Sequence, residues 1–336
     1  MNGNRISHRI RTFICLSLFL SSAPPALAID THRSDIDQFI REVSARNNLD
    51  EAYVRSLLSE AEVKQSIIDA ISRPAEKTKP WHEYRDIFIT EKRIDHGVQF
   101  WREHRESVDQ IACATGIPPT VIISILGVET FYGSITGSYR VIDALTTLAF
   151  EYPPRSRFFR SELEQFLLLT SEERVDPLMA TGSYAGAMGA PQFISSSYRS
   201  YAIDNDGDGR RDLWSSWSDV MGSVANYFHA HGWRPDQPIV AEARVPSSAR
   251  SLLRDDPLNQ KETVGSLRKQ GVEFKTSLPD DARAFVITLD GKNGSEYWVG
   301  FTNFYVITRY NTSVMYAMAV HQLGQEIEVR LNDDAS

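Results

Sequence analysis

The sequence predicts a mainly α-helical protein with one small antiparallel β region. Apolar residues recur at intervals of three and four over most of residues 34–231, which is typical of amphipathic helices. After Pro235 the pattern changes to alternating or continuous apolar runs, at residues 239–245, 284–289 and 297–302. A glycine-containing turn at residues 291–294 separates the last two runs. We therefore expect a β domain inserted between helical parts of the chain.

The helical segments are separated by breaks that the sequence marks. Residues 34–72 predict two amphipathic helices, and two prolines at positions 74 and 80 interrupt the pattern before residues 81–85, a loop or a helix start. Helical spacing resumes over residues 91–113, and a stop and restart at residues 116–119 (GIPP) leads into the next helix. Later helices are expected at residues 141–150, 158–169, 219–231 and 313–323.

The first 28 residues have the organisation of a secretory signal peptide. Three arginines precede the apolar segment 13–20, and a pair of prolines leads into Ala26, Leu27 and Ala28, a small-x-small cleavage site. An apolar segment of eight residues is too short to span a bilayer, which needs about 20. We expect a cleavable signal with cleavage near Ala28, no transmembrane anchor and a periplasmic protein.

Charge and cysteine content limit the function classes. The chain has a net charge of -8, and residues 1–28 hold three arginines and no acid, so the remaining 308 residues carry -11. This acidic balance argues against nucleic acid as a partner. Cys113 is the only cysteine after residue 28, so an internal disulfide is excluded in the mature chain. We expect a monomer.

The apolar run at residues 122–133 (IISILGVETFYG) carries one carboxylate, Glu129. An unpaired charge is costly to bury, so a glutamate in these surroundings requires a reason. Apolar surroundings favour the protonated form of a carboxyl group, which can then donate a proton near neutral pH. Glu129 is therefore a candidate general acid, and the alternative is a glutamate on the helix surface.

Small residues dominate residues 183–193 (SYAGAMGAPQF). They permit close approach of the backbone to another element or to a ligand. Ser183, Tyr184 and Gln192 add hydrogen-bonding groups beside that backbone, which suits a polar chain such as a glycan. A tight helix crossing is the alternative.

Residues 204–212 (DNDGDGRRD) match the start of an EF-hand calcium loop, with acids at positions 1, 3 and 5 and glycine at position 6. The expected ligands are the side chains of Asp204, Asp206 and Asp208 and the backbone of Arg210. Position 12 is Ser215 and lacks the bidentate carboxylate, so the site must borrow one, with Asp219 as the candidate, or bind weakly. We expect a structural Ca²⁺; a solvated acidic turn is the alternative.

Five blocks in this order resemble the lytic murein transglycosylase B family: residues 127–133 (GVETFYG), 183–189 (SYAGAMG), the DGDG loop, 222–228 (GSVANYF) and 303–311 (NFYVITRYN). Together they are far more specific than any one motif. The resemblance covers about residues 80–325, and the part up to about residue 75 matches only weakly.

The resemblance implies a lysozyme-like helical core, an N-terminal helical domain and an inserted β domain. We place the N-terminal helical domain at residues 29–115, the core with the EF-hand-like loop at 116–235 and the β domain at 236–300. Residues 301–336 would return to the core and the helical domain.

The resemblance also implies an activity, cleavage of the β-1,4 bond between N-acetylmuramic acid and N-acetylglucosamine in peptidoglycan strands, leaving a 1,6-anhydro end. Glu129 would act first as acid and then as base, and the 6-hydroxyl of the substrate would be the nucleophile. The same resemblance implies that Ser183 contacts Glu129 and that the glycan groove is lined by Tyr84, Ser183, Gln192, Tyr227, Tyr310, Asn311 and Tyr316.

Two other functions remain open at this point. A muramidase on the same fold would need a second carboxylate about 5 to 9.5 Å from Glu129, and Asp143 and Glu151 are the nearest in sequence. A non-catalytic peptidoglycan-binding or calcium-dependent scaffold protein would not need Glu129.

Overall fold

The computed structural model describes residues 27–73, 79–254, 256–259 and 261–334. Residues 1–26 of the predicted signal peptide lie outside this range. Its last two residues form β1 (Leu27–Ala28), which pairs antiparallel with β2 (Glu62–Val63).

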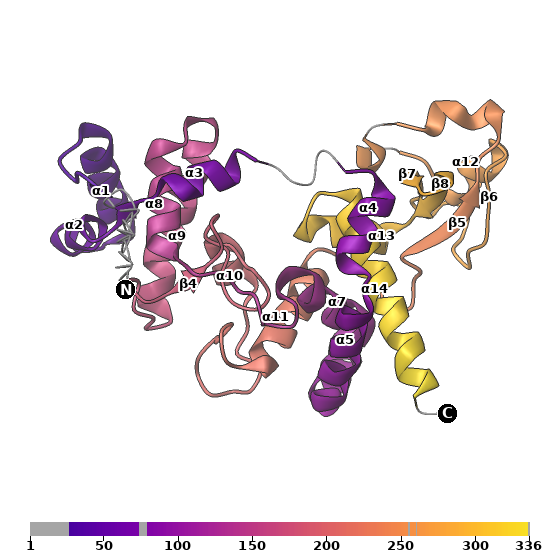
Figure 1. Ribbon diagram of the computed structural model, residues 1–336, viewed down its shortest axis with the longest axis horizontal. Helices are drawn as coiled ribbons and strands as arrows, with labels where there is room; N and C mark the ends of the chain where they lie inside the picture. The colour runs from indigo at the N-terminus through magenta and orange to yellow at the C-terminus, as the bar shows by residue number, and fades with distance from the viewer. Residues whose placement is uncertain (1–26, 74–78, 255, 260, 335–336) are drawn as a thin grey trace, which may run out of the picture.

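The first helices of the chain lie beside helices from its middle (Figure 1). The first group is α1 (Ser34–Asn47), α2 (Glu51–Ser59) and α3 (Gln65–Ile71), and the second is α8 (Val141–Glu151), η2 (Pro153–Arg155) and α9 (Ser156–Glu172). The sequence predicted two helices over residues 34–72, and the structure has three. The extra break lies at β2, which is an extended segment between α2 and α3. The backbone N–H of Glu62 in β2 donates to the Asp143 carboxylate at 3.0 Å.

A second helical group surrounds α7 (Pro119–Thr130), with α5, α6, α11 and α14 packed against it. Its other members are α4 (Trp81–Phe88), α5 (Glu91–Glu103), α6 (Arg105–Thr115), α10 (Ser195–Tyr201), α11 (Trp217–Ala230), α13 (Thr302–Tyr310) and α14 (Val314–Asp333). The helix expected over residues 91–113 is two helices that meet at His104, and α14 extends ten residues beyond the predicted 323. Figure 1 shows α14 running alongside α4 and α5.

The central helix α7 begins and ends at sharp turns. Pro118 is extended and Pro119 occupies the first helical turn, where a missing N–H is tolerated. Every residue from 121 to 128 is buried. The helix then ends in three successive left-handed residues, Phe131, Tyr132 and Gly133, with φ of 51°, 57° and 79°. Such a turn is strained for non-glycine residues, so the surrounding packing must hold it.

Tyr132 packs where two helices come close to it. Its hydroxyl donates to the carbonyl of Arg93 at 2.9 Å. A Cβ added to Gly97 of α5 or Gly127 of α7 would lie 2.5 or 2.6 Å from the Tyr132 hydroxyl. Glycine is therefore required at both positions for this packing.

The β domain is the predicted small antiparallel unit, and the predicted fold class is confirmed. Its sheet has the order β6–β5–β8–β7. The elements are β5 (Val240–Arg244), η3 (Ser247–Leu252), η4 (Pro257–Asn259), α12 (Val264–Lys269), β6 (Glu273–Phe274), β7 (Phe285–Gly291) and β8 (Gly294–Gly300). Both faces of β7 are covered, because Phe285 and Ile287 join the main core while Val286 joins the core of the β domain. A further short antiparallel pair is formed by β3 (Tyr139–Arg140), which precedes α8, and β4 (Thr181–Gly182), which follows α9.

Within the described residues, a single helix long and apolar enough to cross a membrane is not found. The bent pair of α6 and α7, which meet at 117°, reaches that length and composition when taken together.

Candidate active site

Glu129 lies in the last turn of α7, half-buried, and meets a tyrosine from the start of α14. The Tyr316 hydroxyl donates to Glu129 Oε1 at 2.5 Å. Ser313 fixes the start of α14, since its Oγ accepts from the backbone N–H of Tyr316. Burial, and then the neighbouring Glu129 carboxylate, raise the pKa of Tyr316 well above its usual value. Tyr316 therefore keeps its proton and remains a donor to Glu129.

A cavity of about 440 Å³ opens beside Glu129. Five of the seven residues predicted for the glycan groove line it together with Glu129, namely Ser183, Gln192, Tyr227, Tyr310 and Asn311. Its other lining residues are Tyr184, Ala185, Ala187, Phe193, Ile194, Ser197 and Arg309.

Tyr84 and Tyr316, the other two predicted groove residues, are 2% exposed and do not line this cavity. Tyr316 still takes part in the site through its hydrogen bond to Glu129. Tyr84 packs in the core between the rings of Trp81 and Phe88, with centroids at 6.4 and 5.2 Å. The structure therefore places Tyr84 in the core outside this cavity, but near Tyr316, whose pKa the Tyr84 phenol helps to raise.

Hydrogen bonds to the backbone hold the lining side chains. The Tyr310 hydroxyl donates to the carbonyl of Pro191 at 2.6 Å, and the Tyr227 hydroxyl donates to that of Arg309 at 2.6 Å. Burial raises the pKa of Tyr227 to about 12, and burial followed by the Glu129 charge raises that of Tyr310 well above its usual value. Both hydroxyls stay protonated, so the cavity presents neutral, fixed phenols.

The loop of small residues supplies a polar part of the cavity lining. Gln192, in a left-handed conformation with φ of 52°, donates from Nε2 to the carbonyls of Thr136 and Gly189, both at 3.0 Å. Ser183 Oγ accepts from the backbone N–H groups of Ala185 at 3.3 Å and Ala187 at 3.1 Å. Ser183 thus shares the cavity with Glu129, and its oxygen is oriented by its own loop.

The sequence interpretation missed Arg309. It lies inside the recognised block 303–311, directly before Tyr310. An arginine on an amphipathic helix gives no local signal of facing a cavity, so only the fold reveals its position.

The two candidates for a second catalytic carboxylate each pair with an arginine, and neither lines the cavity. Asp143 is fully buried and accepts from Arg140 Nε at 2.9 Å and Nη2 at 2.8 Å. Glu151 is paired with Arg33 Nη1 at 2.6 Å. Among the described residues lining the cavity, Glu129 is the only carboxylate.

Three acids converge at the EF-hand-like loop. Asp204, Asp206 and Asp219 each offer one carboxylate oxygen, and these oxygens lie within 4.8 Å of one another. Hard carboxylate oxygens at this separation fit Ca²⁺, which prefers oxygen ligands. Asp219, the acid predicted to replace Ser215 as a ligand, comes from α11 and is fully buried. Asp208 is outside this triad, and the backbone N–H of Arg210 donates to it.

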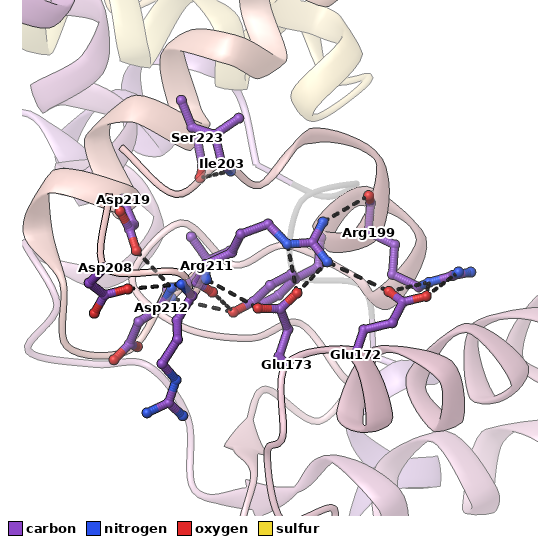
Figure 2. Close-up of polar contacts among 12 residues, drawn as sticks. Glu172, Glu173, Arg199, Ile203, Asp208, Arg211, Asp212, Asp219 and Ser223 are labelled. Carbon is purple, nitrogen blue, oxygen red and sulfur yellow. Dashed lines mark hydrogen bonds and ion pairs between the residues drawn. The ribbon is translucent and has the colours of Figure 1, made fainter. Parts of the chain in front are cut away.

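The loop is tied to neighbouring helices on both sides (Figure 2). Arg211 pairs with Glu173, through Nε at 2.6 Å and through Nη2. Asp219 Oδ2 accepts from the backbone N–H of Asp212 at 2.9 Å. The carboxylates therefore sit in a frame that links the end of α9 to the start of α11.

Comparison with known proteins agrees with this geometry. Residues 31–325 match the transglycosylase SLT domain family. The membrane-bound lytic murein transglycosylase B of Escherichia coli (strain K12) is 40% identical over 301 residues, which cover 86% of this chain and 81% of that protein.

Solved structures are similar over nearly the whole chain. The catenated lytic transglycosylase SltB1 from Pseudomonas aeruginosa superposes with a TM-score of 0.85 and 49% identity, covering 89% of this chain and 98% of that one. The Escherichia coli lytic transglycosylase Slt35 in complex with calcium gives 0.82 and 37%, covering 91% and 96%. SltB3 from Pseudomonas aeruginosa in complex with NAG-anhNAM-pentapeptide gives 0.77 and 29%, covering 87% and 78%.

The family match spans residues 31–325, and the Escherichia coli enzyme shares 40% identity over 86% of this chain. The chain therefore belongs to the lytic murein transglycosylase B family and is a lytic murein transglycosylase, a lyase.

Proposed function

We propose that this chain cleaves the β-1,4 bond between N-acetylmuramic acid and N-acetylglucosamine with Glu129 as its single acid and base. The observation that carries the proposal is the cavity itself, in which Glu129 is the only carboxylate among the described lining residues. Hydrolases of the common retaining or inverting kind need a second one.

The reaction needs only this one group and the substrate. Protonated Glu129 gives its proton to the glycosidic oxygen as the bond from that oxygen to C1 of muramic acid breaks, and positive charge develops at C1. The 2-acetamido group of the sugar stabilises this cation. Glu129, now a carboxylate, takes the proton of the 6-hydroxyl while O6 bonds to C1. Glu129 ends protonated, the product is the 1,6-anhydro sugar, and water is not consumed.

The neighbours of Glu129 support the change of role. The Tyr316 hydroxyl donates to Oε1 and stabilises the carboxylate that forms in the first half of the reaction. Tyr227 and Tyr310 offer flat apolar faces to sugar rings, and Gln192 and Asn311 line the same cavity with polar groups.

Digestion of purified sacculi tests this function. Wild type is expected to release products with anhydro ends, whereas Glu129→Gln is expected to release none. Glu151→Gln is the matched control, because Glu151 pairs with Arg33 outside the cavity, and it should keep the wild-type products. Products heavier by one water would indicate a muramidase, and equal activity of Glu129→Gln and wild type would remove Glu129 from the chemistry.

We further propose that the loop holds a structural Ca²⁺ through Asp204, Asp206 and Asp219. The convergence of the three carboxylates supports it, as does the calcium in the Slt35 complex. Bound there, the ion would offset two of the three neighbouring negative charges and fix the loop, with no part in bond cleavage.

We also propose that the chain is exported to the periplasm. The basic and then apolar order of residues 1–28 supports this, as does a peptidoglycan substrate.

A further inference from the structure

Arg309 is the only cation among the described residues that line the catalytic cavity. It lies in the last turn of α13, directly before Tyr310. The ion pairs formed between described residues do not include it. Its buried Nε has no hydrogen-bond partner in the part of the chain that the structure describes. The contacts within the fold therefore leave this charged donor without a full set of hydrogen-bond partners.

The guanidinium is nevertheless held in place. Its Cζ lies 4.3 Å from the centroid of the Tyr305 ring, and its Nη2 donates to Thr308 Oγ1 at 3.2 Å. Arg283 lies 4.0 Å from the same centroid. Two cations this close to one ring must occupy opposite faces, so Tyr305 separates them. Arg309 is thus pre-positioned, with N–H donors left for a ligand.

The substrate brings an anionic group to this place. The two sugars of the strand differ only in the lactyl ether on C3 of muramic acid, which ends in a carboxyl group or in its amide with a peptide. The 6-hydroxyl that attacks C1 belongs to the same ring. When C1 and O6 of that ring lie at Glu129, its lactyl branch must enter the cavity or its rim.

We propose that Arg309 binds the lactyl carboxyl group of this muramic acid and so distinguishes it from N-acetylglucosamine. The guanidinium fork matches a carboxylate in two parallel charge-assisted hydrogen bonds. An amide carbonyl accepts from the same donors but carries no charge. Arg309 is therefore a substrate-binding residue that prefers strands with a free lactyl carboxylate. This inference rests on the proposed function.

The test compares two forms of the same glycan strands, one bearing peptides and one freed of them by an amidase. Arg309→Gln is expected to lower kcat/KM about 30-fold on the peptide-free strands, mainly through KM, because a charge-assisted pair is lost. On peptide-bearing strands the same change is expected to cost about threefold. Arg283→Gln is the matched control, since Arg283 stacks on the same ring but lines a different cavity, and it should change both values by less than about twofold.

An equal loss on both substrates would overturn the proposal, because a structural role of Arg309 would not depend on the lactyl charge. An unchanged Arg309→Gln would also overturn it, and anhydro products in either case would leave the proposed function standing. Arg309→Lys and wild type keep the test decisive if Arg309→Gln does not fold. Arg309→Lys should retain part of the preference for peptide-free strands, and the wild-type preference should shrink as salt is raised. A wild type without preference at low salt contradicts the inference.

Discussion

The Tyr316 hydroxyl lies 2.5 Å from Glu129 Oε1 and joins the first turn of α14 to the last turn of α7. A donor at this position stabilises the carboxylate more than the acid form. Tyr316→Phe is expected to lower kcat about tenfold, since a hydrogen bond to a charged group is lost. Without the donor, Glu129 releases its proton at higher pH, so the alkaline limb of the rate profile should move upward in pH. The measurement is kcat on murein strands from pH 4 to 9.

Tyr297→Phe serves as the control for that experiment, because Tyr297 lies on β8 of the β domain and outside the lining of the catalytic cavity. Its pH profile should follow wild type. A Tyr316→Phe profile with an unmoved alkaline limb would show that the bond does not influence proton transfer.

The close packing of Tyr132 predicts a coupled pair of substitutions. Gly127→Ala would place a Cβ 2.6 Å from the Tyr132 hydroxyl, 2.8 Å from Tyr132 Cζ and 3.0 Å from Leu323 Cδ2. We expect it to lower the free energy of unfolding by about 1–3 kcal/mol, as overpacking does. Removing the hydroxyl by Tyr132→Phe relieves the nearest contact, so Gly127→Ala should cost less in that background. Urea unfolding of the four proteins measures the coupling, and strictly additive values would mean that the hydroxyl is not the obstacle.

The carboxylate triad predicts stabilisation by calcium. At 100 times its dissociation constant, an ion that binds only the folded state adds about 2.7 kcal/mol, which raises Tm on the order of 5 °C. Asp219→Asn should abolish most of this rise, because Asp219 is the buried member of the triad. Asp290→Asn, an exposed acid of the β domain, should leave it intact. The measurement is a melting scan with calcium and with chelator, and an identical Tm in both would refute the site.

The catalytic helix could be predicted from sequence because its signals are local. Pro118, Pro119 and the apolar run set the start and the burial of α7, and the single carboxylate is visible in it. The β domain was equally accessible through alternation and its glycine turn. Asp219 could be proposed as a ligand because Ser215, at loop position 12, lacks the carboxylate that the calcium loop needs.

The remaining features depend on packing between distant segments. The spacing of apolar residues continues through His104, so the division of residues 91–113 into two helices leaves no periodic trace. Tyrosine suits both a sugar platform and a core, and only the inward face of α4 assigns Tyr84 to the core. Arg309 was missed for a related reason, since most of the cavity that it lines is built from Glu129 and residues 183–197, more than 100 residues away in the sequence.

His321 on α14 predicts a loss of stability in acid. Burial lowers its pKa from 6.5 to about 4. Well above pH 6.5 it is neutral in both states, so it contributes nothing to the pH dependence there. As pH falls from 6.5 to 4 the unfolded chain binds a proton that the folded chain does not, and the free energy of unfolding falls by at most about 3 kcal/mol. His321→Gln, which cannot take up the proton, should remove this part of the acid sensitivity.

Urea unfolding of wild type and His321→Gln at pH 7, 6, 5 and 4 measures the effect. The difference between their free energies of unfolding should be constant near neutrality. As pH falls, His321→Gln should become more stable relative to wild type, and the difference should level off below about pH 4. His229→Gln is the control, because His229 is an exposed histidine on α11. If the difference between wild type and His321→Gln does not change with pH, His321 is protonated as readily in the folded protein as in the unfolded chain, and the acid sensitivity must come from the paired carboxylates.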